Sequence, residues 1–336
     1  MAQSMRWTIV LSLPFTTVCA AMPPCPIVLI QILRNAITPY LLKLAVLVTL
    51  SFASTAHALD SFRIGLLGGE NAQDRLSRLS CLQEKVEAEL GVPVKMFTPA
   101  DYNGVLQGLL GGTIDMAGLG ASGYAKVWLS DPQAIIPAVT RINKGGGLGY
   151  HSIAFARRDS GINSLADMRA RVFGFGDPNS TSGYLIPAIE IPQLGYDMTP
   201  GVYFDDVKFT GGHEQTIIAV KNGSIDAGVV WSDGLGAWED GHNSGALRKA
   251  VDAGLVDMND FVEIWRSKPI PEGPMVFHRS LPEDIRERLT LMLLDMPKSD
   301  PECAYNVMAG EAEGYQRVSH ENYDSIVEAR RLKAAQ

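Results

Sequence analysis

The stretch GDPNSTSGYL, residues 176–185, carries three hydroxyl side chains and no lysine or arginine. It follows a short apolar run at residues 172–175 and precedes a second one at residues 185–191. This order predicts a buried strand, a turn and the start of a helix. The first turn of a helix has free backbone N–H groups and the positive end of the helix dipole, so small hydroxyl residues there favour a bound anion. An ordinary helix cap at Asn179 or a neighbouring hydroxyl is the alternative.

Strand-like and helix-like stretches alternate on both sides of this motif. Strands are predicted at residues 61–67, 92–97, 114–119, 135–141, 151–157, 172–175, 207–210, 225–230, 262–265 and 275–278. Helices are predicted at residues 73–90, 101–110, 185–191, 215–221, 282–296 and 311–331, and a capping box at Ser164 predicts one more. This alternation is typical of the α/β class.

Two α/β units of similar size follow from this order. We predict one lobe from residues 59–150 plus 266–336 and a second lobe from residues 151–265, joined by two crossing strands. Ligands of open α/β sheets bind at the carboxyl ends of strands, so we expect a ligand cleft between the lobes.

Residues 1–58 differ in composition from the rest of the chain. They contain three basic residues and no acidic one, and the apolar run LAVLVTLSF at residues 44–52 precedes an A-x-A pattern at residues 56–58. These features predict a signal peptide that is cleaved after Ala58, which leaves a soluble exported protein.

The charge and cysteine content of the remaining chain exclude some partners. The leader holds three of the 29 basic residues and none of the 37 acidic ones, so residues 59–336 carry a net charge of −11. Such a charge argues against nucleic acid as a partner but not against a small anion. Two cysteines remain after the leader, Cys81 and Cys303. Their wide separation favours two buried thiols, although export permits a disulfide.

Polar residues at predicted strand ends are the candidate binding groups. His213 begins a helix, where an imidazole tends to lose its proton and a bound dianion would restore it. Asp233 follows a strand and is placed to hold a cationic group of a ligand, with an N-cap as the alternative. Tyr102 and Tyr150 can donate phenolic hydrogen bonds, with half-buried packing as their alternative role.

Enzyme signatures in the sequence are weak. The stretch at residues 176–185 lacks the lysine of a phosphate-binding P-loop, because Tyr184 stands in its place. The stretch HEQTI at residues 213–217 is not a zinc-binding H-E-x-x-H, and neither a G-x-S-x-G elbow nor a cysteine cluster is present. We therefore expect no catalytic activity, no metal and no cofactor.

The chain resembles a known family, the phosphonate-binding proteins of ABC transporters, which are periplasmic receptors with a two-lobed type II fold. The resemblance covers about residues 62–300. It rests on the stretches PADYNGV at 99–105, GYHS at 149–152, GDPNSTSGY at 176–184, GHE at 212–214, IDAG at 225–228 and SKPIPEGP at 267–274.

The resemblance implies a role for each matching residue. Ser180, Thr181 and Ser182 would hold the phosphonate oxygens through their hydroxyls and backbone N–H groups. Donors from both lobes would be supplied by Tyr102, Tyr150 and His213.

The chain departs from the family pattern where members present carboxylates to the amine of 2-aminoethylphosphonate. One of these positions falls on Asp233 and the other on Gly273, with Glu272 beside it. An aromatic residue that other members carry is also missing from the stretch at residues 118–122.

The sequence therefore predicts a non-catalytic periplasmic receptor that closes its lobes over a phosphonate-type oxyanion and delivers it to an inner-membrane permease. A phosphite or phosphate receptor of the same fold is the first alternative. An exported phosphate-ester hydrolase, with Ser180 or His213 as nucleophile, is a more distant one.

Overall fold

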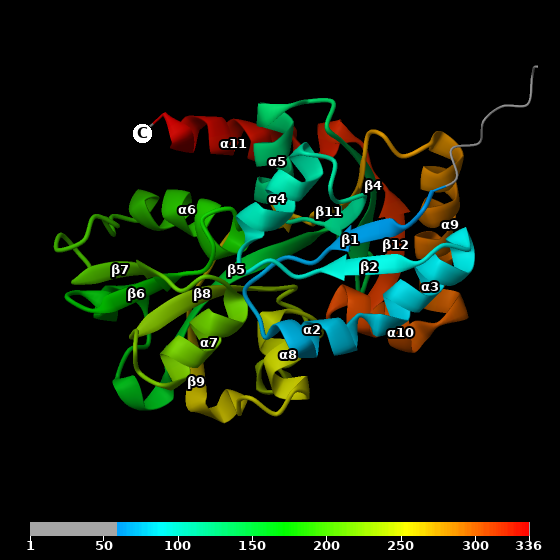
Figure 1. The fold of residues 1–336 in the computed structure, drawn as a ribbon. Coiled ribbons are helices and arrows are strands. Elements are labelled where there is room, and N and C mark those ends of the chain that lie inside the picture. The colour runs from blue at the N-terminus through cyan, green and yellow to red at the C-terminus, as the bar shows by residue number, and fades with distance from the viewer. Residues whose placement is uncertain (1–58, 336) are drawn as a thin grey trace, which may run out of the picture. The chain divides into compact units, whose positions relative to one another are not determined.

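The computed structural model describes residues 59–335, so the predicted signal peptide lies outside the described residues. The described chain is built on two sheets, in agreement with the predicted α/β class (Figure 1). In spatial order, the strands of the first sheet are β12 (Ala312–Arg317), β4 (Ile135–Asn143), β11 (Pro274–His278), β3 (Met116–Gly118), β1 (Phe62–Gly65) and β2 (Val94–Phe97).

The second sheet is formed by strands from the middle of the chain. In spatial order, its strands are β10 (Ile270–Pro271), β5 (Gly149–Arg157), β8 (Ala227–Ser232), β6 (Val172–Phe175) and β7 (Asp206–Phe209), with β9 (Phe261–Arg266) paired to β5. The β1–β2 and β1–β3 pairs are parallel, as are β6–β7 and β6–β8. Each sheet thus contains a parallel part whose strand ends are followed by helices.

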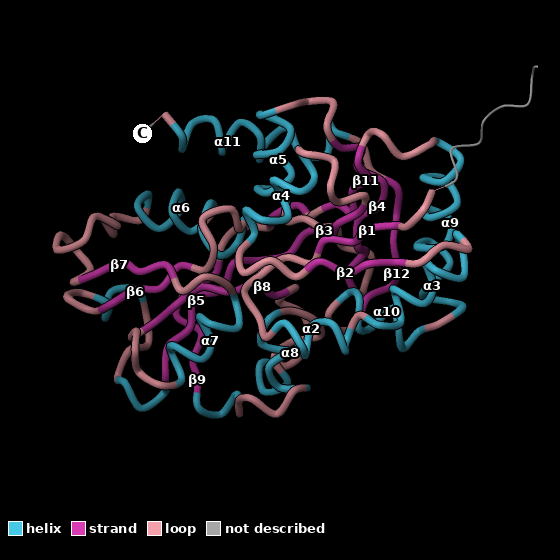
Figure 2. The backbone as a smooth tube through the Cα atoms, in the orientation of Figure 1, coloured by secondary structure: helices cyan, strands magenta, loops and turns pink. Residues whose placement is uncertain are grey.

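Helices lie outside the strands of both sheets (Figure 2). The α-helices are α2 (Ala72–Arg78), α3 (Ser80–Leu90), α4 (Tyr102–Leu110), α5 (Ala121–Ser130), α6 (Pro187–Gln193), α7 (His213–Lys221), α8 (Ala246–Asp252), α9 (Glu283–Ser299), α10 (Pro301–Met308) and α11 (Asp324–Ala334). Among residues 59–335, no helix is both long and apolar enough to cross a membrane.

The apolar side chains of the strands form the cores under the helices. Phe62 and Ile64 of β1 and Phe173 of β6 are buried because helices cover both faces of the sheets. The chain passes between the sheets twice, from β4 to β5 and from β9 and β10 to β11. Two passages agree with the predicted two-lobed fold. The lobe boundaries near residues 150 and 265 remain a prediction.

Two predicted helices are wrong in part. The helix expected at 73–90 is two helices, because Leu79 leaves helical geometry and becomes both the end of α2 and the cap of α3. The helix expected at 311–331 begins as strand β12, which pairs antiparallel with β4. Gly314 of β12 has a positive φ of 149°, a conformation that few other residues adopt. Pairing with the exposed edge of β4 thus overrides a composition that favours a helix.

The capping box expected at Ser164 opens only a short 3₁₀ segment, Leu165–Met168. The Ser164 side chain makes no cap to the backbone and instead donates its hydroxyl to Asp167 Oδ2, 2.9 Å away. Asp167 also accepts the Asn163 N–H. The Asn163 N–H and the Ser164 hydroxyl, which could have capped a longer helix, are thus bonded to Asp167 within the local turn.

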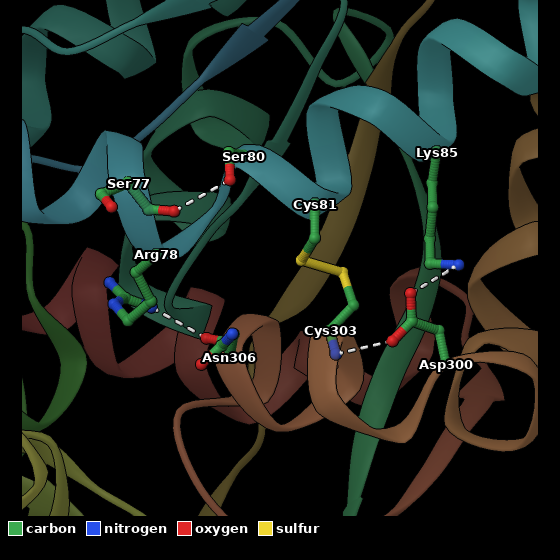
Figure 3. The surroundings of a disulfide bond; sticks show 8 residues. All are labelled: Ser77, Arg78, Ser80, Cys81, Lys85, Asp300, Cys303 and Asn306. Carbon is green, nitrogen blue, oxygen red and sulfur yellow. Dashed lines mark hydrogen bonds and ion pairs between the residues drawn. A yellow bond between two sulfur atoms is a disulfide. The ribbon is translucent and has the colours of Figure 1, made fainter.

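A disulfide joins Cys81 to Cys303, so the expectation of two free thiols is wrong (Figure 3). The bond connects α3 to α10, and its two cysteines are 222 residues apart in sequence. The ion pair between Lys85 and Asp300 lies beside it. The two cysteines meet because both helices pack on the first sheet, a contact that sequence spacing alone does not reveal.

Candidate functional site

The GDPNSTSGYL stretch forms a turn and the beginning of a helix, as its sequence predicts. Asp177 closes the turn by accepting the Asn179 N–H at 2.6 Å with Oδ1. Its Oδ2 accepts the backbone N–H of Tyr102 at 3.1 Å. Tyr102 begins α4, which belongs to the helices around the first sheet, whereas the turn follows β6 of the second. One carboxylate therefore ties the turn to the opposite lobe.

The hydroxyl groups of the turn are held in a particular orientation. Ser180 caps the π-helical turn Thr181–Leu185, and its Oγ accepts the Gly183 N–H at 3.0 Å. The Oγ1 of Thr181 accepts the N–H of Ser122 at 2.9 Å. A hydroxyl oxygen that accepts from a backbone N–H still has its own hydrogen to donate. Ser180 can therefore cap the helical turn and still donate its hydroxyl hydrogen to an anion. The helix-cap and anion-binding interpretations are thus compatible.

Six of the seven predicted site residues line one cavity of about 300 Å³. They come from both lobes and are Tyr102, Tyr150, Ser180, Thr181, Ser182 and His213. Burial raises the pKa of the Tyr102 and Tyr150 phenols, because a phenolate would be poorly solvated there. Both phenols therefore remain neutral and can act as hydrogen-bond donors at neutral pH.

His213 is the first residue of α7, and its Nδ1 is buried with no hydrogen-bond partner among the described residues. Burial, reinforced by the nearby Lys249 ammonium, lowers the pKa of His213 to about 3. The ring is therefore neutral at pH 7, and a neutral imidazole has one nitrogen that donates and one that accepts. An unpartnered nitrogen at a cavity wall is a natural contact for a ligand oxygen.

Asp233 is not among the residues that line this cavity. It follows β8 and is buried, with its N–H donating to the Ser244 carbonyl at 3.0 Å. Its Oδ1 accepts the Leu235 N–H at 3.2 Å. These contacts hold the loop after β8 and suit the capping alternative, whereas the Oδ2 of Asp233 is buried with no hydrogen-bond partner among residues 59–335.

Most charged residues of the cavity wall were missed by the sequence reasoning, which named only Glu272 among them. Six acidic or basic side chains other than His213 line the cavity, namely Glu70, Arg75, Arg78, Arg141, Lys249 and Glu272. Glu70 pairs with Arg78 at 2.8 Å and with Lys249 at 3.2 Å, and Lys249 comes from α8 beside the second sheet. No motif marks these residues: Arg75, Arg78, Arg141 and Lys249 lie on helices or a strand, Glu70 and Glu272 lie in loops, and their meeting depends on the assembled lobes.

The expected carboxylate position at Gly273 cannot hold any side chain in this structure. A Cβ added to Gly273 would lie 1.9 Å from the Leu119 carbonyl oxygen and 2.8 Å from the Gly120 Cα. Glu272 beside it lines the cavity, but its Oε1 accepts from Arg141 Nη2 at 2.7 Å. Burial raises the pKa of Glu272 against the opposing effect of Arg141. The carboxylate of Glu272 is thus already paired with Arg141.

Comparison with known proteins identifies the relatives of the chain. Residues 64–323 match the family model described as ABC transporter, phosphonate, periplasmic substrate-binding protein. The chain is 28% identical over 261 residues to the phosphonates-binding periplasmic protein of Escherichia coli, covering 75% of this chain and 71% of that one. It is 25% identical over 239 residues to the phosphate-import protein PhnD of Mycolicibacterium smegmatis, covering 69% and 71%.

Solved structures support the fold. The binding-protein component of an ABC phosphonate transporter from Pseudomonas aeruginosa has a TM-score of 0.69 at 22% identity, covering 82% of this chain and 86% of that one. PhnD1 of Prochlorococcus marinus, solved with methylphosphonate, has a TM-score of 0.67 at 20% identity, covering 82% and 99%. The family model spans well over half of the sequence, and the chain therefore belongs to the phosphonate periplasmic substrate-binding proteins of ABC transporters.

Proposed function

We propose that this protein captures a small phosphonate-type oxyanion in the periplasm and delivers it to the permease of an ABC transporter. The observation that carries the proposal is the cavity in which Ser180, Thr181, Tyr102, Tyr150 and His213 meet. All five are neutral groups that offer hydrogen-bond donors at neutral pH, and Ser180 and Thr181 have their hydroxyl oxygens already occupied by backbone N–H groups.

Neutral donors on a rigid turn suit an anion with several oxygens. Each hydrogen bond to a charged oxygen is shorter and about twice as strong as one between neutral groups. Because the turn is tied to Tyr102 and Ser122 of the first lobe, ligand contacts made there would act on both lobes together. We propose that closure of the lobes around the oxyanion is the signal that the permease reads.

A receptor for phosphite or phosphate is the second candidate. The small volume of the cavity, about 300 Å³, favours compact ligands. Relatives of the chain include proteins named for phosphate import and for phosphite binding. The two candidates differ in whether the cavity accepts a carbon substituent on phosphorus.

The test is calorimetric titration of residues 59–336 after removal of any bound ligand. The panel is methylphosphonate, ethylphosphonate, 2-aminoethylphosphonate, phosphite and phosphate. Tight binding of any phosphonate supports the main proposal, and binding of phosphite or phosphate alone supports the second candidate. Absence of binding across the panel would refute both. Delivery is tested separately, by growth on the bound compound as sole phosphorus source with and without the gene.

A further inference from the structure

The charges of the cavity wall do not balance. Four cationic side chains and two carboxylates line it, and His213 is neutral at pH 7, so the wall carries a net charge of about +2 before any ligand enters. A phosphonate head with two negative charges matches this excess. A ligand that adds an ammonium group to the head leaves one positive charge of the wall uncompensated.

Both carboxylates of the wall already have cationic partners. Glu70 contacts Arg78 and Lys249, and Glu272 contacts Arg141. Glu272 is only 9% exposed and its partner Arg141 only 6%. A buried pair of this kind loses much free energy when one partner is taken away. A ligand ammonium would have to compete with Arg141 for the same carboxylate.

The guanidinium of Arg141 is fixed by several contacts at once. Its Nη2 donates to Glu272 and to Asn143 Oδ1 at 2.6 Å, and its Nη1 donates to the Met308 carbonyl at 2.9 Å. It also lies over the ring of Trp231 at 5.0 Å. Arg141 therefore cannot swing away to release Glu272 without breaking contacts in both lobes.

Two guanidinium nitrogens of the wall residues are left without a hydrogen-bond partner in the described chain. The Nε atoms of Arg75 and Arg141 are buried and have no hydrogen-bond partner among residues 59–335. Arg75 is 2% exposed and also lines the cavity. Buried donors without partners are costly, which makes each a favourable contact for a ligand oxygen and an unfavourable neighbour for a ligand cation.

The wall beside Glu272 offers no room for a replacement acid. The Gly273 backbone packs directly against Leu119 and Gly120, so no side chain at residue 273 reaches the cavity. The described residues that line the cavity thus contain no carboxylate that is free to receive an ammonium group.

From these observations we propose that the cavity selects phosphonates whose organic tail is uncharged and rejects those with an ammonium tail, and that Arg141 determines this selectivity through its pair with Glu272. The inference rests on the proposed function, because it specifies the ligand class of the same site.

The test compares two ligands of nearly equal size, propylphosphonate and 2-aminoethylphosphonate, which differ by a methyl group in place of an ammonium. Titration at about pH 9 keeps both heads mostly doubly ionised and the amine protonated, because an alkylphosphonate loses its second proton at a higher pH than a phosphate ester, for which the value is about 6. We expect propylphosphonate to bind at least about tenfold more tightly, a difference of about 1.4 kcal/mol.

Variants at Arg141 then distinguish the effect of its charge from the effect of its size. Arg141→Met frees Glu272 and removes a positive charge, so the preference should move about tenfold toward 2-aminoethylphosphonate. Arg141→Lys keeps the charge and should keep the preference for the propyl compound. If Arg141→Met does not fold, Glu272→Gln provides the opposite change and should weaken the binding of the amine further.

The possible outcomes separate the inference from the proposed function. Equal or tighter binding of 2-aminoethylphosphonate by the wild-type protein would overturn the inference and leave the phosphonate receptor intact. An unchanged preference in Arg141→Met, with the variant folded, would overturn the role of Arg141. Failure of both compounds and of the whole panel would overturn the proposed function, and the inference would fall with it.

Discussion

The neutral imidazole of His213, which is half-buried with its Nδ1 enclosed, makes the stability of the ligand-free protein depend on pH. Its pKa is about 3 in the folded protein and 6.5 as the ordinary value. A group with a lowered folded pKa contributes stability that is fully present above the unfolded pKa. That stability is lost as the pH falls from 6.5 toward 3, because the unfolded chain then binds a proton that the folded protein does not.

The size of the effect follows from the two pKa values. At about pH 5 the unfolded imidazole is mostly protonated and the folded one is not, which corresponds to about 2 kcal/mol of lost unfolding free energy relative to about pH 7.5. The ring is half-buried although its Nδ1 is buried, so partial solvation reduces the expected loss to about 1–2 kcal/mol.

Urea denaturation at the two pH values measures this loss, with His213→Asn as the comparison. The variant keeps a polar group near the Nδ1 position but does not titrate, so it should lose about 1–2 kcal/mol less than the wild type. Other histidines contribute equally to both proteins and cancel in the difference. Equal losses in wild type and variant would refute the buried, neutral state of His213.

A saturating oxyanion should reduce the same pH dependence. A bound dianion next to the ring favours its charged form and raises its pKa toward the ordinary value. Ligand-bound wild-type protein should therefore lose less stability on acidification than ligand-free protein. A pH dependence that ligand leaves unchanged would place the oxyanion away from His213.

Three further predictions concern the turn, the loop after β8 and the disulfide. Thr181→Ala should weaken oxyanion binding by about 1–3 kcal/mol in calorimetry, whereas Thr181→Ser keeps the hydroxyl and should stay within about 1 kcal/mol of wild type; equal affinity in all three proteins would contradict the cradle. Asp233→Asn should change affinity by less than about 0.5 kcal/mol, because Asp233 does not line the cavity; a loss greater than about tenfold would return it to the binding site. Replacing Cys81 and Cys303 together by serine should lower the unfolding free energy by about 2–5 kcal/mol without affecting affinity; unchanged stability in denaturant would show that the bond contributes nothing.

The sequence was informative where structure depends on near neighbours. The turn at 176–185 and the start of α4 are local, so hydroxyl spacing and strand order were enough to place Ser180 and Thr181 at a helix start, where the structure has them lining a cavity. The segment at 312–317 was misread because its strand exists only through pairing with β4, about 170 residues earlier in the chain.

The ion pairs of the cavity wall could not be predicted for the same reason. Arg141 and Glu272 are 131 residues apart, and Lys249 lies 179 residues from Glu70. Neither pair has a sequence pattern of its own, since any surface arginine or lysine looks alike until the lobes are assembled. The charge of the cavity wall is therefore a property of the fold and not of a motif.

The bond between α3 and α10 closes a covalent ring that contains the whole of the second sheet and both passages between the lobes. A protease that cuts any loop inside this ring produces two fragments that remain linked through sulfur. The nicked protein would migrate as one species until it is reduced. In a compartment that contains proteases, a receptor with such a ring can suffer a single cut and still keep both walls of its cavity on one molecule.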